Sequence, residues 1–200
     1  MAEWWHKCEA IPLARPNFQK IIEFYLFKCP CETESGSRKK NNKVYSAVSN
    51  QSITFRNQGW IKGKLNTLRS AMINTASSGN LQYKSFPKGA KIDILSDNIE
   101  KESHLSDQHF EMIIIAERAD MSITCSIFYY IRNALAHGSF GYVTSSGKRT
   151  YYFESAKKGA INARIRLREE TLLKWIEYFN YSPSELRAQL VANRHRRNKS

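Results

Sequence analysis

"MSITCSIFYYIRNALAHG" is the stretch, residues 121–138, that decides the predicted fold and holds the first candidate site. An uncharged apolar run is followed at once by Arg132, Asn133 and His137. Gly138 stands where a left-handed residue commonly ends a helix. Because burying three polar side chains together is costly without a role, this helix end is predicted to be a functional site.

The helix that carries this stretch is predicted to be the longest in the chain. We expect it to begin near Gln108, capped by Ser106 or Asp107, and to end at His137. Such a helix has roughly 30 residues and is about 45 Å long. Its second half is apolar nearly all round, which predicts burial in a bundle or against another subunit.

The flanking sequence predicts more helices and one small sheet. Helical spacing of apolar residues occurs at 17–28, 60–76, 90–103, 169–179 and 183–194. Residues 83–90 are predicted to be a loop. Strand-like segments at about 139–168 are separated by turn-forming residues and predict an antiparallel hairpin or three-stranded insert. The predicted fold is therefore mainly α: one domain over 1–200, with this insert and a basic tail at about 194–200.

Composition fits a globular protein with no membrane span. The 200 residues are 42% hydrophobic and 12% aromatic, and no long uninterrupted apolar stretch occurs. The N-terminus lacks the features of a signal peptide, so a cytoplasmic protein is expected. We expect Cys125 to be a buried residue that packs like an apolar one, and Cys8, Cys29 and Cys31 to be reduced thiols. Their spacing gives little support to a zinc site, and no metal or cofactor is expected.

The net charge of +13 favours a polyanionic partner such as RNA. In residues 163–168, ARIRLR, alternation would place Arg164, Arg166 and Arg168 on one face of a strand. A spacing of about 7 Å between these side chains suits a phosphate backbone. A solvated strand face beside Glu169 is an equally good interpretation. The aromatic residues at 128–130 and 151–153 could stack bases, although aromatic residues at this density usually form a core.

The side chains at the helix end have a definite chemistry. His137 can transfer protons near neutral pH, Arg132 can bind a phosphate, and Asn133 can orient either group. Arg132 and His137 lie about 140° apart around a helix, so one helix does not aim both at one point. Two copies paired about a two-fold axis would bring both residues into one cleft. If RNA is the substrate, its own 2′-hydroxyl serves as the nucleophile.

The pattern R-N-x-x-x-H near the C-terminal end of a long helix, followed by Gly, resembles the ribonucleases of the HEPN superfamily (higher eukaryote and prokaryote nucleotide-binding domain). The resemblance implies a helical bundle that forms a homodimer with a composite active site. It also implies metal-independent RNA cleavage that leaves a 2′,3′-cyclic phosphate and a 5′-hydroxyl. Arg132 would steady the phosphate, His137 would transfer protons and Asn133 would support the geometry.

By the same resemblance, the chain would be a toxin or anti-phage defence effector, with an antitoxin or regulatory partner. Other interpretations remain open. The same bundle could bind RNA or a nucleotide without cutting it, or serve as a protein-interaction module. His137 could be a helix-terminal residue only, and Arg132 could pair with Glu154 or Glu169 to anchor the insert. Glu117 and Arg118 read as a polar stripe on the predicted long helix.

Overall fold

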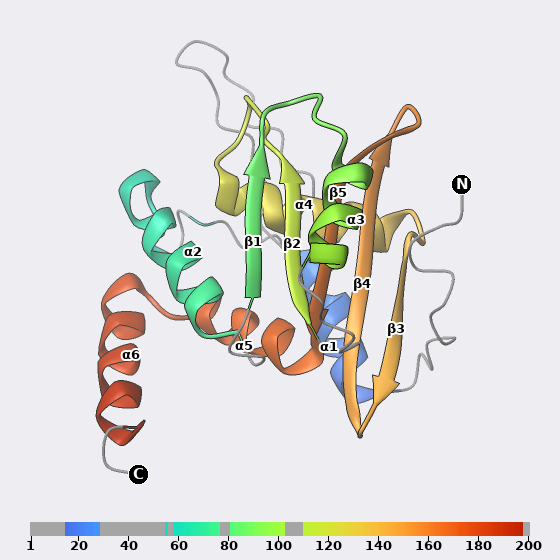
Figure 1. Ribbon diagram of the computed structural model, residues 1–200. Coiled ribbons are helices and arrows are strands. Elements are labelled where there is room, and N and C mark those ends of the chain that lie inside the picture. Colours follow the sequence, from blue (N-terminus) through green and yellow to red (C-terminus); the bar gives the residue numbers. More distant parts are fainter. Residues whose placement is uncertain (1–14, 29–54, 56–57, 77–80, 103–109, 198–200) are drawn as a thin grey trace.

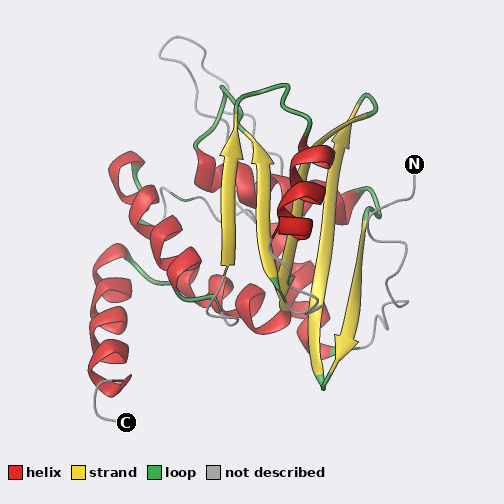
Figure 2. Cartoon of the chain, in the orientation of Figure 1, coloured by secondary structure: helices red, strands yellow, loops and turns green. Residues whose placement is uncertain are grey.

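The protein is an α/β structure built on one five-stranded sheet with helices on both faces (Figures 1 and 2). The computed structural model describes residues 15–28, 55, 58–76, 81–102 and 110–197. None of the helices in these ranges is both long and apolar enough to cross a membrane.

The sheet is mixed, with strand order β1-β2-β5-β4-β3. Strands β1 and β2 are parallel, and α3 connects them as a crossover helix. The other three strands are antiparallel to their neighbours. The bounds are Leu81–Phe86 for β1, Ile92–Glu102 for α3, Glu111–Ala116 for β2, Phe140–Ser145 for β3, Lys148–Lys157 for β4 and Ala160–Arg168 for β5.

The larger core lies between one face of the sheet and most of the helices (Figure 1). Side chains of β2 alternate, so Ile113 and Ile115 enter this core whereas Met112 and Ile114 face α3 on the other side. The helical elements are α1 (Pro16–Ile22), the π-helical turn η1 (Glu23–Lys28), the 3₁₀ turn η2 (Lys62–Lys64), α2 (Leu65–Asn74), α4 (Ile123–Ala136), α5 (Glu169–Asn180) and α6 (Pro183–Arg197).

Helix α3 is attached to the sheet by ion pairs from buried arginines as well as by apolar contacts. Arg164 of β5 is only 6% exposed; its Nε lies 2.9 Å from Glu154 Oε2 and its Nη1 lies 2.6 Å from Asp97 Oδ1. Arg166 is 8% exposed and its Nη2 lies 3.3 Å from Glu100 Oε1. The basic face of β5 therefore packs beneath α3.

The prediction of a mainly α helical bundle is wrong. Strands β3, β4 and β5 were expected as a small insert at about 139–168, and they do form there as antiparallel strands. However, β5 pairs with β2, so these strands are the larger part of the central sheet. The helices pack on this sheet instead of forming a bundle of their own.

The predicted long helix from Gln108 to His137 is also wrong. Residues 111–116, EMIIIA, form the interior strand β2, which is buried on both faces. A continuous apolar run is typical of a strand covered on both sides, and its three isoleucines favour a strand. Helix α4 begins only at Ile123, where the Ser122 side chain accepts a hydrogen bond from the Cys125 backbone N–H. The N-cap expected at Ser106 or Asp107 lies outside the described residues.

The remaining helix predictions are confirmed, at 17–28, 60–76, 90–103, 169–179 and 183–194, with shifts at the ends. The predicted loop at 83–90 is wrong in its first half, because β1 extends to Phe86. Gly138 has φ +69° and so ends α4 in the left-handed conformation predicted for it. A single domain over 1–200 stays a prediction.

We expect Arg164→Met to lower the free energy of unfolding by about 3–5 kcal/mol, because it leaves the carboxylate of Glu154 buried without its cation. The double variant Arg164→Met/Glu154→Leu should recover part of this loss, since no unpaired charge remains. Urea unfolding of both variants measures the difference. Equal losses in the two variants would show that the ion pair is not what the single variant disrupts.

Candidate functional site

Helix α4 packs across one face of the sheet, close to the ends of β1, β2 and β4 (Figure 1). Strand β2 ends at Ala116 shortly before α4, and β3 begins at Phe140 directly after it. Because β2 and β4 run parallel to each other and antiparallel to β3, the end of β2 and the start of β3 lie at the same edge. The helix therefore crosses from one side of the sheet to the other along the strand ends (Figure 1).

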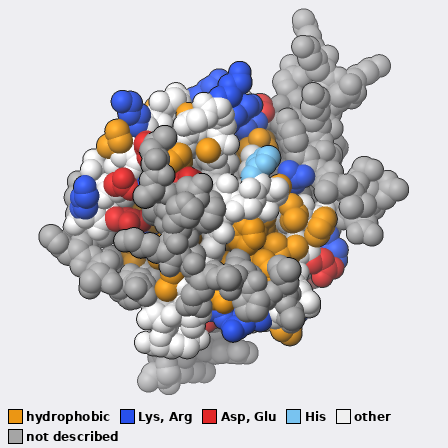
Figure 3. Space-filling model, turned by 90° about the vertical axis from the view of Figure 1, so that its right-hand side faces the viewer, with side chains coloured by type: hydrophobic (Ala, Val, Ile, Leu, Met, Phe, Trp, Pro, Cys, Tyr) orange, Lys and Arg blue, Asp and Glu red, His pale blue; other side chains and the backbone are white. Residues whose placement is uncertain are grey.

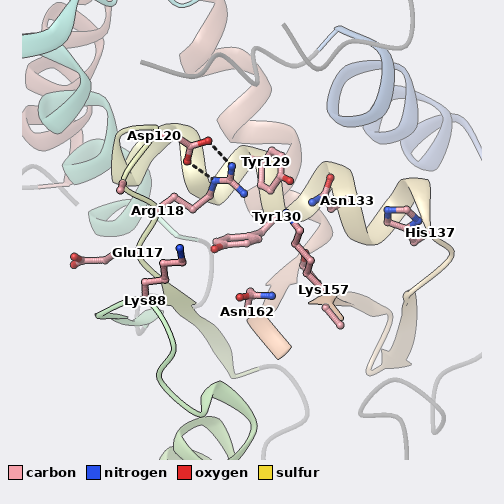
Figure 4. Close-up of a pocket in the computed structure, with 13 residues that line it drawn as sticks. Lys88, Glu117, Arg118, Asp120, Tyr129, Tyr130, Asn133, His137, Lys157 and Asn162 are labelled. Carbon is pink, nitrogen blue, oxygen red and sulfur yellow. Dashed lines mark hydrogen bonds and ion pairs between the residues drawn. The ribbon is translucent and has the colours of Figure 1, made fainter. Parts of the chain in front are cut away.

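A groove of about 480 Å³ separates α4 from these strand ends, a size typical of small-molecule sites. Ligands of open α/β sheets commonly bind at the carboxyl ends of the parallel strands. The groove collects residues from both parallel strands, from α4 and from the β4–β5 hairpin (Figure 4). Its lining residues include Lys88, Glu117, Arg118, Asp120, Tyr129, Tyr130, Asn133, His137, Lys157 and Asn162.

Helix α4 supplies one wall of the groove through residues spaced four apart. Tyr129, Asn133 and His137 share a face because four residues are close to one helical turn. His137 is the C-terminal cap residue and is exposed. Within the described part of the chain, neither the Asn133 amide nor the His137 ring has a hydrogen-bond partner. Both are free to contact a ligand.

The opposite wall carries exposed lysines. Lys157 lies at the end of β4, and the turn that follows it, Lys158–Gly159, has positive φ at both residues. Such a tight turn fixes the tip of a hairpin. Lys88 follows β1, is exposed, and lines the same groove. Among the described residues neither lysine is in an ion pair, so both charges are available to an anion.

Arg118 is held rigidly at the end of β2. Its Nε and Nη2 donate to the two carboxylate oxygens of Asp120 at 3.0 and 2.6 Å, and its Cζ lies 4.2 Å from the Tyr129 ring centroid. Burial alone would lower the pKa of Arg118, but the hydrogen bond to Asp120 and the nearby tyrosines raise that pKa above its usual value. The guanidinium is thus a fixed, permanently charged plane in the groove.

Arg132 does not line the groove that holds Asn133 and His137. Its Nε is buried without a hydrogen-bond partner among the described residues. The alternative prediction, that Arg132 pairs with Glu154 or Glu169, is wrong. Glu154 pairs with Arg164, and Glu169 pairs with Arg149. The structure therefore brings together two of the three predicted catalytic residues.

The apolar side of α4 was expected to be buried within the chain or against a second subunit, and its residues pack in the core of the same chain, among them Ile127, Phe128 and Ile131. The predicted RNA-binding arginines lie away from the groove. Arg164 and Arg166 are buried beneath α3, and Arg168 ends β5 at the opposite edge of the sheet. Their binding of RNA stays a prediction.

The aromatic residues divide between core and groove. Phe128, Tyr151 and Phe153 are buried in the large core, whereas Tyr129 is partly exposed and lines the groove. On the face in Figure 3, a histidine side chain lies between basic side chains and a group of hydrophobic ones. The side of the molecule that carries the end of α4 is thus mixed in character.

Sequence reasoning missed Lys88, Arg118, Asp120 and Lys157. Arg118 was assigned to a polar stripe on a long helix that does not form. The available signal was the change from the apolar EMIIIA to the charged ERAD, which is typical of a strand followed by a turn at a sheet edge. Recognising that strand end would have pointed to a ligand-binding edge.

Comparisons with known proteins do not identify a family. No protein-family model matches the chain, and no significant match occurs among curated proteins or solved structures. Cys125 is buried and is not part of a disulfide, while the other three cysteines lie outside the described residues. Among the residues that are described, no group of three or more His, Cys, Asp or Glu side chains is placed to hold a metal ion.

Tyr130, in the floor of the groove, makes a prediction about alkaline stability. Burial, more than any other cause, raises its pKa from 10.0 to about 12, and its hydroxyl donates to the Ala116 carbonyl at 2.8 Å. Between these pH values the unfolded chain releases the proton and the folded chain keeps it, so the free energy of unfolding falls as pH rises. The fall due to Tyr130 should be about 2–3 kcal/mol.

Tyr130→Phe should remove this part of the alkaline loss, at a cost of about 1 kcal/mol near neutral pH for the missing hydrogen bond. Denaturant unfolding between pH 8 and roughly pH 12 measures both effects. Tyr151→Phe is a second test in the core: burial, more than any other cause, raises the pKa of Tyr151 too, so this variant should also lose part of the alkaline fall. An unchanged pH slope in Tyr130→Phe would contradict the assignment.

Proposed function

We propose that this protein is an endoribonuclease of the cytoplasm that cuts RNA in the groove beside α4 without a metal ion. The observation that carries the proposal is the grouping of the exposed His137 and the half-buried Asn133 with Lys88 and Lys157, which form no ion pair within the described part of the chain. A proton-transfer group next to available cations is what cleavage by the 2′-hydroxyl of RNA requires.

The reaction is an internal transfer at one phosphorus. His137 takes the proton of the 2′-hydroxyl, the 2′-oxygen attacks the adjacent phosphorus, and the bond from phosphorus to the 5′-oxygen breaks. The leaving oxygen takes up a proton, so the products are a 2′,3′-cyclic phosphate and a 5′-hydroxyl. Lys157 and Lys88 balance the charge that grows on the phosphoryl oxygens, and Asn133 orients either the imidazole or the phosphate.

The groove of one chain supplies a single imidazole among its described residues. Cleavage by this route uses both a base and an acid, and a second copy of the chain would bring a second His137. We therefore keep a homodimer as part of the proposal, with contact near the exposed end of α4. Arg132, whose Nε lacks a partner among the described residues, would reach the site only in such a pair.

Binding without cleavage is the second candidate function, and the single imidazole favours it. In that case the groove would hold RNA or a nucleotide through its lysines, with affinity that falls steeply with salt. This module would produce no new RNA ends.

We expect the wild-type protein to cut single-stranded RNA in EDTA, and His137→Ala to lower the rate by about 10²–10⁴-fold because proton transfer is lost. Gel analysis of a labelled oligoribonucleotide, with mapping of the product ends, makes the measurement. The same oligonucleotide with a 2′-deoxy sugar at the cut position should stay intact.

Lys148→Gln is the matched control for Lys157→Gln, because the two lysines stand at opposite ends of β4. Removing Lys157 should slow cleavage, while removing Lys148 should not. Cleavage that requires a divalent metal, or that is unchanged in His137→Ala, would refute the mechanism.

The dimer has its own test in the mass of the protein in solution. Light scattering of the wild-type protein should give twice the chain mass, and Arg132→Ala should abolish cleavage without loss of the folded state. If the wild-type protein is a monomer and still cuts RNA, the second copy is not part of the site. If Arg132→Ala cuts RNA as fast as the wild type, Arg132 is not part of it either.

If the enzyme is a toxin or defence effector, its production in cells should degrade RNA and stop growth, and His137→Ala should relieve both effects. A partner that neutralises the activity would restore growth when produced together with the wild-type protein.

A further inference from the structure

We propose that the part of the groove at the carboxyl ends of β1 and β2 is a nucleobase subsite, in which one unpaired base of single-stranded RNA stacks on the face of Arg118 that Tyr129 does not cover. The inference rests on RNA being the ligand of the groove. It adds a recognition element to the lysines and to the residues at the end of α4.

The first step is the fixed orientation of Arg118. Two of its nitrogens bind both oxygens of Asp120, and its Cζ lies 4.2 Å over the Tyr129 ring. The side chain is 19% exposed, and what remains accessible lines the groove (Figure 4). An arginine held along one edge and on one face has little rotamer freedom left to lose on binding.

The second step is that Arg118 is better suited to a base than to a phosphate. Asp120 already occupies the fork of donors with which a guanidinium would bind a phosphate in bidentate fashion, and it neutralises much of the charge. A planar and weakly hydrated guanidinium still stacks well on another planar group. Phosphate binding then falls to Lys88 and Lys157, which have no such partner among the described residues.

The third step is the polar surroundings of this stack. Glu117 lines the groove and uses Oε1 to accept from Ser85 at 3.0 Å, while Asn162 donates its amide to the Ala160 carbonyl at 3.0 Å. The second carboxylate oxygen of Glu117 and the Oδ1 of Asn162 are acceptors. Glu117 points away from Arg118 and Asn162 lies across the groove (Figure 4), so these acceptors stand elsewhere in the groove, where they favour a ligand with an exocyclic amino group, such as adenine.

A duplex does not meet these requirements, because its bases are stacked on each other and their faces are covered. Recognition by stacking on aromatic and guanidinium planes is the usual way in which proteins bind unpaired RNA bases. The arrangement therefore predicts a preference for single-stranded RNA with an accessible base.

Binding of a 2′-O-methyl oligoribonucleotide with a central 2-aminopurine tests the subsite, because this probe lacks the hydroxyl needed for cleavage. The wild-type protein should bind the single strand at least tenfold more tightly than the duplex and quench the 2-aminopurine fluorescence. The same oligonucleotide with an abasic central position should bind about tenfold more weakly, as expected for the loss of one stacked base.

Variants separate stacking from charge. Arg118→Lys keeps the charge but not the plane, and Tyr129→Leu keeps the apolar contact but not the ring; both should abolish quenching. Lys157→Gln should weaken binding and keep the quenching, and Lys148→Gln should change neither. Thermal unfolding of each variant confirms that it is folded.

Equal affinity of the wild-type protein for the abasic and the complete probe would overturn the subsite. Failure of the wild-type protein to bind the probe would also overturn it, and so would full quenching by the Arg118→Lys variant. These outcomes are distinct from failure of the proposed function. RNA cleavage by a protein that ignores the abasic change would refute only the subsite. Quenching by a protein that never cuts RNA would refute only the enzyme.

Discussion

The position of α4 along the strand ends is the constraint on which the candidate site depends. The chain leaves β2 at Ala116, is capped at Ser122, and must reach β3 at the far edge of the sheet. Three strand spacings separate β2 from β3, about 14 Å, and a helix of the length of α4 covers about 21 Å. Gly138 then turns the chain into β3. The helix therefore crosses the sheet and displays its polar end beside the β4–β5 hairpin.

Local periodicity predicts part of this fold well. The helices around Ile21, Leu68 and Leu172 each have one apolar stripe, and the strands after Gly138 alternate between turns, so each pattern specifies its element. The prediction for residues 111–116 was wrong because a strand that is buried on both faces shows no alternation of apolar and polar residues. Because β2 was predicted to be helical, the strand that pairs with β5 was missing from the prediction. The strands β3, β4 and β5 were therefore predicted to be a small insert.

The site was predictable only where its residues share one element. Asn133 and His137 are four apart on a helix, so the sequence alone places them on one face. Arg118 and Lys157 reach the same groove through the register of β2 against β5 and of β5 against β4. No local pattern encodes that register. A short motif can therefore indicate one wall of a groove, but the opposite wall follows only from the pairing of distant strands.

The distribution of ion pairs explains why a chain with a net charge of +13 offers its positive charge at so few defined points. Arg164 and Arg166 are buried against carboxylates under α3, and Arg118 is tied to Asp120. These three arginines position structure, since a paired guanidinium adds little attraction for a distant anion. The attraction near the end of α4 therefore comes from the exposed Lys88 and Lys157. The groove therefore combines one arginine plane, Arg118, with two exposed lysine charges, Lys88 and Lys157, and these two kinds of group suit different parts of a ligand.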